Sequence, residues 1–177
     1  TGALGVRSSD GATRTLAHIP MYETRKLAMG YVPVFLGPVY RAAVLPERTC
    51  VGWAARWEVS CYSRDGTLRT RTVRETSPGA VTDDDKRLFR EGFMRANRGV
   101  PREQAELTAR SFPFAERRSA YGRFVPATTG ELWVGEFVIS EEIFLGRTGL
   151  GSPAVETTWS VLAPDGRWIA DVRLPAH

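Results

Sequence analysis

The sequence contains few of the residues on which metal chemistry and acid–base catalysis most often depend, since its 177 residues include only two histidines and two cysteines. The zinc-protease pattern HExxH, the hydrolase pattern GxSxG, the dinucleotide pattern GxGxxG and the phosphate-binding P-loop are all missing. These absences exclude zincins, α/β-hydrolases and the common nucleotide-binding folds. No apolar run approaches the ~20 residues that a transmembrane helix needs, so we predict no membrane span.

Lysine is also scarce, because only Lys26 and Lys86 are present and arginine supplies nearly all of the positive charge behind the net charge of +4. The arginines are scattered along the chain and are not interleaved with aromatic residues, as they are in proteins that bind single-stranded nucleic acid. We therefore predict no nucleic-acid partner.

A hydrophobic content of 42% and a charged content of 25% are typical of a globular protein, and the length fits one domain over residues 1–177. The sequence opens Thr-Gly-Ala-Leu without methionine. From this opening we expect either that a targeting segment has been removed or that the chain is part of a longer protein.

One pattern occurs three times: an alternating run, an Asp-Gly pair and a second alternating run, over residues 3–20, 57–75 and 158–175. The tight turn of a β-hairpin needs a positive φ that Gly and Asp tolerate, so Asp-Gly between such runs is a strong hairpin signal. The sequence therefore predicts three hairpins in a mainly β protein. Residues 21–30 lack this pattern and are predicted to be a connector.

The two cysteines are placed so that one further hairpin would bring them together. If residues 49–53 and 57–63 pair, Cys50 lies directly opposite Cys61, at a cross-strand distance close to that of a disulfide. The alternative is two small buried thiols. A disulfide would indicate an oxidising compartment, outside the cytoplasm. Neither cysteine has a histidine or second cysteine at ligand spacing, so we predict no metal at this pair.

The periodicity changes to that of helices over residues 82–110. Thr82 can cap a helix whose first turn holds three aspartates. Their negative charges are stabilised there by the positive end of the helix dipole. Gly99 can end this helix and Pro101 can begin a second one. Capping explains the three aspartates more simply than a metal site does. We predict a pair of helices inserted between β segments.

Two segments, GELWVGEF and WSVLAPDGRWIADVRLP, resemble the last part of bacterial six-bladed β-propellers of the NHL-like kind. WEVSCYSRDGTLRTRTVRE, followed by VTDDDKRLFRE, is similar to a preceding blade and helical insert of such proteins. The resemblance covers most of residues 3–20 and 49–175. It implies about three four-stranded antiparallel sheets, part of a six-bladed ring, completed by further blades of the same chain or by a second copy in a homodimer.

The resemblance also implies a periplasmic or surface-anchored bacterial protein in which the strand of LWVGEF lies innermost, which makes Glu136 a candidate ligand-binding residue. Tyr121, Phe144 and the loop over residues 140–153 are candidate contacts, because loops on a rigid scaffold often carry function. We predict a non-catalytic binding or scaffold protein for a protein, peptide or glycan, without a cofactor. The alternative is an enzyme, a lyase or lactonase-like hydrolase, with a divalent metal in the central channel.

Overall fold

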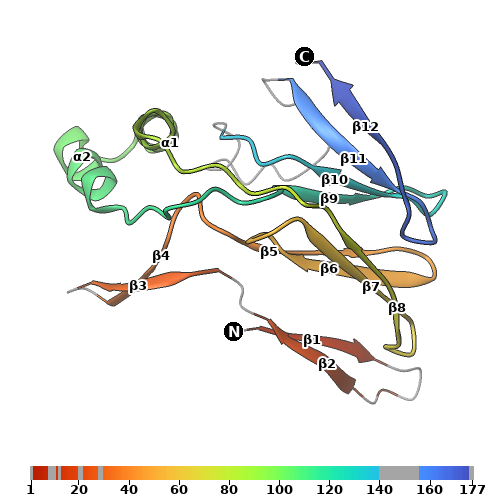
Figure 1. Cartoon of the computed structure of the whole chain (residues 1–177). Helices are drawn as coiled ribbons and strands as arrows, with labels where there is room; N and C mark the ends of the chain where they lie inside the picture. The colour runs from red at the N-terminus through yellow and green to blue at the C-terminus, as the bar shows by residue number, and fades with distance from the viewer. Residues whose placement is uncertain are drawn as a thin grey trace.

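The computed structural model describes residues 2–7, 11, 13–19, 22–27, 30–139 and 156–175. The described chain is dominated by antiparallel β-sheet, with two helices between the eighth and ninth strands (Figure 1). The strands are β1 (Gly2–Arg7), β2 (Thr13–Ile19), β3 (Thr24–Leu27), β4 (Gly30–Pro33), β5 (Tyr40–Val44), β6 (Arg48–Trp53), β7 (Glu58–Ser63), β8 (Leu68–Val73), β9 (Arg123–Pro126), β10 (Leu132–Gly135), β11 (Thr157–Leu162) and β12 (Trp168–Leu174). The helices are α1 (Asp83–Ala96) and α2 (Arg102–Ser111), which confirms the predicted insertion.

The strands form two four-stranded sheets and two two-stranded ones. We call β5-β6-β7-β8 the middle sheet and β9-β10-β11-β12 the C-terminal sheet; β1 pairs with β2, and β3 pairs with β4. The three predicted Asp-Gly hairpins are confirmed as β1–β2, β7–β8 and β11–β12. Their turn glycines, Gly11, Gly66 and Gly166, have φ values of 85°, 83° and 83°, which only glycine adopts without strain.

Three expectations about the sheets are wrong. The first hairpin does not join a third four-stranded sheet, residues 24–33 form the β3–β4 hairpin rather than a connector, and β10 lies between β9 and β11 instead of innermost. The sheets are separate and open, and no closed ring forms among the described residues. An Asp-Gly turn specifies only the two strands that it joins, whereas the number of strands in a sheet depends on contacts distant in sequence.

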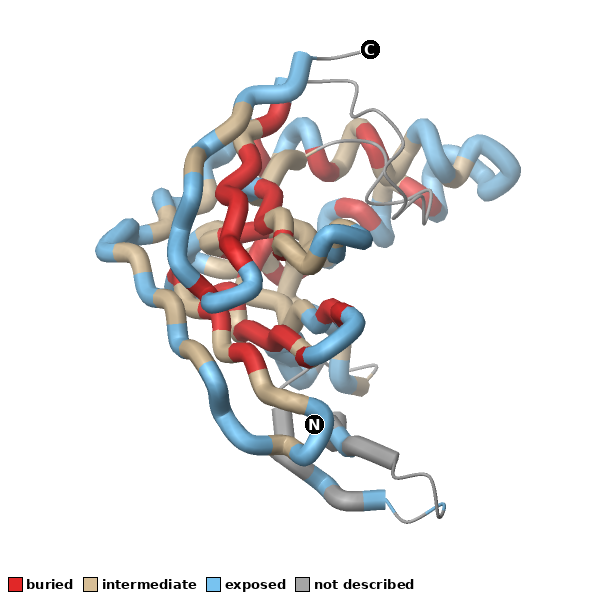
Figure 2. The backbone as a smooth tube through the Cα atoms, turned by 90° about the vertical axis from the view of Figure 1, so that its right-hand side faces the viewer, coloured by how far each residue is buried: buried red, intermediate tan, exposed pale blue. Residues whose placement is uncertain are grey.

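The core lies where the middle and C-terminal sheets face one another (Figure 2). The middle sheet contributes Val59 and the disulfide-bonded pair Cys50 and Cys61, which is 0% and 2% exposed. Leu132 and Val134 of the C-terminal sheet pack into the same cluster. The Cys50–Cys61 disulfide joins directly opposed residues of β6 and β7, so the predicted register is confirmed.

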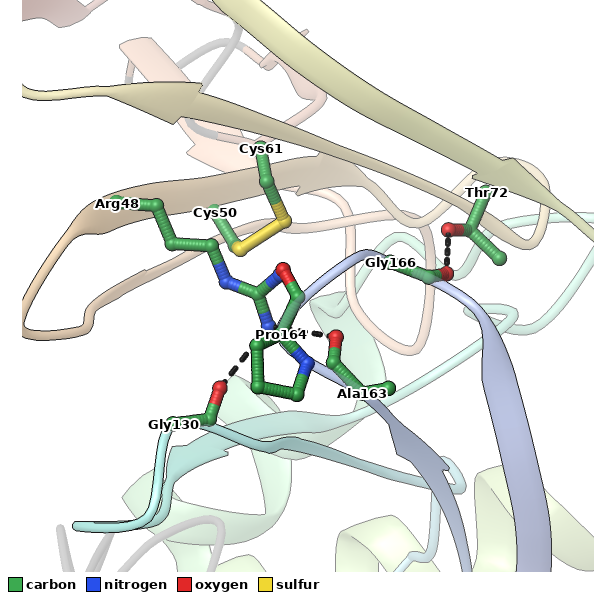
Figure 3. Close-up of a disulfide and its surroundings, with 8 residues drawn as sticks. All are labelled: Arg48, Cys50, Cys61, Thr72, Gly130, Ala163, Pro164 and Gly166. Carbon is green, nitrogen blue, oxygen red and sulfur yellow. Dashed lines mark hydrogen bonds between the residues drawn. A yellow bond between two sulfur atoms is a disulfide. The ribbon is translucent and has the colours of Figure 1, made fainter.

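Arg48, a buried residue of the middle sheet, makes polar contacts with the C-terminal sheet (Figure 3). Its guanidinium donates to the carbonyl oxygens of Gly130 at 3.0 Å, of Ala163 at 2.9 Å and of Pro164. Thr72 donates its hydroxyl to the carbonyl of Gly166 at 2.5 Å. Because these acceptors lie at two turns of the C-terminal sheet, Arg48 and Thr72 fix that sheet against the middle one.

Arg74, which follows β8, forms a second polar link between the two sheets. It donates to both carboxylate oxygens of Asp171 on β12, at 2.8 and 3.0 Å, and lies 5.4 Å from the ring centroids of Trp57 and Trp168. The hydrogen bond from Arg74, together with those from the Ser160 hydroxyl and the Trp168 indole, lowers the pKa of Asp171 to about 2. Asp171 therefore stays ionised in this contact down to low pH.

Asp171→Asn is expected to make folding less sensitive to acid. Because the pKa of Asp171 is lower in the folded protein than in the unfolded chain, where it is about 3.9, the ionised carboxylate stabilises the fold at any pH above about 3.9. This stabilisation is lost as the pH falls from there towards the pKa of the folded protein. Because the Asp171 side chain is 36% exposed, solvent screens the pair and we expect only about 0.5–1 kcal/mol. Urea unfolding of both proteins at about pH 6 and about pH 2.5 checks this: the stability difference should shrink at the lower pH. An equal difference at both values would contradict it.

The helices are attached by capping and by aromatic packing. The Thr82 hydroxyl accepts from the Asp85 N–H, the Asp85 carboxylate accepts from the Thr82 N–H, and Arg118 binds the same carboxylate. This capping box confirms the predicted start of α1. Five phenylalanines then hold the helix pair to the segment before β5 and the one after α2: Phe35, Phe89, Phe93, Phe112 and Phe114. Within the part of the chain that the structure describes, neither helix is long and apolar enough to cross a membrane.

Candidate functional site

A pocket of about 410 Å³ lies between the last turn of α1 and the first turn of α2. We call it the helix-tip pocket. Its lining residues come from both helices and the turn between them: Met94, Arg95, Asn97, Arg98, Val100, Arg102, Ala105 and Glu106. The helix pair lies at the opposite end of the molecule from the β7–β8 and β11–β12 turns (Figure 1). The pocket is therefore well separated from the contacts that hold the two sheets together.

The short turn after α1 sets the shape of this pocket. Asn97 caps α1 by donating its backbone N–H to the Phe93 carbonyl at 3.1 Å and its side-chain amide to the same oxygen at 2.8 Å. Val100 donates to the Asn97 carbonyl at 3.0 Å, and Pro101, with φ −50°, is the N-cap of α2. We predicted that Gly99 ends α1, but the C-cap is Asn97, and Gly99 does not adopt the left-handed conformation of a helix-ending glycine.

The pocket combines an apolar floor with a basic rim. Met94, Val100 and Ala105 supply apolar surface, and Val100 is 38% exposed although it is a large hydrophobic residue. Arginines line the rim, of which Arg102 binds Glu106 at 2.9 Å. Apolar surface with a few convergent polar groups is typical of ligand sites, and guanidinium groups bind carboxylates well because their donors form a planar fork.

The predicted contact residues do not gather at this pocket. Tyr121 is 0% exposed in the core, where its hydroxyl donates to the Glu58 carbonyl at 3.0 Å. Burial raises the pKa of Tyr121 above its usual range, with a smaller contribution from the charge of Glu58. Tyr121 is therefore a core residue rather than part of an exposed binding surface. Phe144 and the loop over residues 140–153 lie outside the described residues.

Glu136 lies just after β10 and is exposed. Its carboxylate accepts from the Thr158 backbone N–H at 2.6 Å, and its own N–H donates to the Thr158 carbonyl at 2.9 Å. Glu136 therefore extends the pairing of β10 with β11. Whether it also binds a ligand stays a prediction.

The acidic residues at the start of α1 are occupied by contacts within the helix and its cap. Asp83 binds Lys86 at 2.8 Å, Asp84 binds Arg87, and Asp85 forms the capping box. No group of three or more His, Cys, Asp or Glu that could hold a metal occurs within residues 30–139 and 156–175 or the shorter described segments.

The helix-tip pocket was not predicted, although the sequence carries a signal for it. Residues 92–102 contain three arginines and no Asp or Glu, whereas both helices otherwise mix the two signs of charge. A short basic run of this kind is also typical of ordinary solvent-exposed turns, so it does not by itself predict a binding pocket. The apolar floor appears only when α1 and α2 pack, because Met94 and Ala105 belong to different helices.

No protein-family model and no curated protein matches the chain. A search of solved structures finds a member of the DUF4221 family from Bacteroides vulgatus, with a TM-score of 0.43 and 11% sequence identity. The match covers 94% of this chain and 41% of that one, so the chain spans well under two thirds of that protein.

The resemblance to NHL-like six-bladed propellers is wrong. The sheets of the described residues are separate and open, and no family model of this kind matches the chain. The residues that suggested it are explained by two local features: the Asp-Gly hairpins at Gly66 and Gly166, and two tryptophans buried in the sheets. Trp57 and Trp159 are buried at 6% and 4% exposure, as core residues of ordinary sheets also are.

Proposed function

We propose that the protein is a non-catalytic binding protein that recognises a partner protein or peptide outside the cytoplasm through the helix-tip pocket. The observation that supports this most directly is Val100, a solvent-exposed apolar residue in a pocket of about 410 Å³ ringed by arginines. This volume falls within the range of roughly 300–1,000 Å³ that is typical of ligand-binding clefts. The position of the pocket on a projecting helix pair favours a macromolecular partner, which can reach it without entering the sheets.

The proposed compartment rests on the disulfide. Disulfides persist in secreted and periplasmic proteins and are rare in the reducing cytosol. Cys50 and Cys61 are both buried in the core, where they join neighbouring strands of the middle sheet. A buried cross-link of this kind supports a structural role in an oxidising environment.

A random peptide display selection on the whole chain tests the proposed function. Peptides enriched over uncoated support should bind the wild type and bind Val100→Asp at least about tenfold more weakly, since the variant places a charge on the apolar floor. Leu107→Asp is the matched control: Leu107 is 62% exposed on α2 and does not line the pocket, so this variant should bind as the wild type does. Isothermal titration calorimetry with the enriched peptides gives their affinities for the wild type and for both variants. The proposal fails if no peptide is enriched, or if the two variants bind equally.

A further inference from the structure

We infer that the helix-tip pocket selects an acidic peptide segment, in which carboxylates flank one aliphatic side chain. The inference rests on the proposed function and specifies the chemistry of the partner.

The charge of the pocket is strongly one-sided. Three of the eight lining residues are arginines and one is a glutamate, so the lining carries a net charge of +2 (+3 from arginine and −1 from Glu106). Among the described residues no carboxylate lies within ion-pair distance of Arg98. An arginine fork without a protein carboxylate on a pocket rim is available to a carboxylate of a partner.

The rim itself shows which group its arginines bind. Arg102 holds the carboxylate of Glu106 at 2.9 Å, and the Arg102 side chain is 88% exposed. An exposed pair of this kind contributes little to stability, so it exchanges readily for a partner carboxylate. Arg98, on the other side of Val100 in the turn, provides a second position for a carboxylate.

The floor accounts for the aliphatic residue between the carboxylates. Met94, Val100 and Ala105 offer apolar surface, and methionine adapts to the shape of a bound side chain. None of the eight lining residues is aromatic. Nucleic-acid bases are held chiefly by stacking on aromatic side chains, so the same positive charge favours a peptide over a single-stranded nucleic acid.

The probe is the amidated pentapeptide Glu-Glu-Leu-Glu-Glu with a dye on its N-terminus. The whole chain is titrated into this peptide, and binding is followed by fluorescence anisotropy. We expect binding to weaken about fivefold in Arg98→Gln and about twentyfold in Arg98→Gln combined with Arg102→Gln. Arg69→Gln is the matched control, because Arg69 is an exposed arginine on β8, outside the pocket, and its loss should change the affinity less than twofold. The pentapeptide Gln-Gln-Leu-Gln-Gln and the pentapeptide Glu-Glu-Ala-Glu-Glu should each bind more weakly than the probe.

The outcomes separate this inference from the proposed function. In one outcome, displayed peptides bind the wild type and not Val100→Asp, but the enriched sequences are neutral or basic and the pentapeptide with glutamines binds as well as the probe. That outcome overturns the selection of acidic segments and leaves the proposed function standing. Equal loss in Arg69→Gln and Arg98→Gln would show general charge attraction and would also overturn the inference. If no peptide of either kind binds, both proposals fail.

Discussion

Arg48→Ala is expected to lower the free energy of unfolding by about 3 kcal/mol, because it removes charge-assisted hydrogen bonds to three carbonyl oxygens at once. The acceptors belong to Gly130, Ala163 and Pro164, and the bond to Ala163 is fully buried. Burial lowers the pKa of Arg48, yet an arginine stays charged at neutral pH even so. The variant therefore leaves the C-terminal sheet without its main polar link to β6.

Guanidinium chloride unfolding of three variants measures this effect. Arg48→Lys keeps the charge and loses the planar fork, so its stability should fall between that of wild type and Arg48→Ala. Arg69→Ala removes an exposed arginine from the same sheet and should change stability by less than about 0.5 kcal/mol. A loss in Arg48→Ala no greater than that in Arg69→Ala would contradict the role assigned to Arg48.

Features that depend on neighbouring residues could be predicted from the sequence. The Asp-Gly hairpins, the Thr82 capping box and the opposition of Cys50 to Cys61 all follow from residues within about a dozen positions of each other. Turn chemistry, cap chemistry and the two-residue period of a strand act over this range. The β3–β4 hairpin lacks an Asp-Gly turn, and its strands are only four residues long, so no comparable signal marks it.

Features that depend on distant residues could not be predicted. Arg48 contacts residues 82 to 116 positions away, and Tyr121 contacts Glu58 at a separation of 63. Nothing local distinguishes Tyr121 from an exposed tyrosine in a loop, since its burial results from the meeting of the two sheets. The candidate site shows the same limit: the basic run over residues 92–102 is visible in the sequence, whereas the apolar floor depends on the packing of α1 against α2.

Removal of the disulfide by Cys50→Ala together with Cys61→Ala is expected to lower the free energy of unfolding by about 3 kcal/mol in the chain-entropy account, in which the cross-link restricts the unfolded chain. The cysteines are 11 positions apart, so the closed loop is short and its contribution is moderate. Alanine is the appropriate replacement because both positions are buried, and serine would add hydroxyl groups to an apolar core.

Reduction of the wild type gives an independent measurement of the same cross-link, and the double variant is its control. Urea unfolding with dithiothreitol should shift the wild-type midpoint towards that of the double variant and leave the variant itself unchanged. Thiol titration of the denatured wild type should find no free thiol before reduction and two after it. Arg48 and Cys50 are two residues apart on β6 and so lie on the same face of the strand (Figure 3), and Arg48→Ala should therefore destabilise the reduced protein by a different amount from the oxidised one. Equal effects in both forms would show that the cross-link within the middle sheet and the arginine between the sheets stabilise the protein independently.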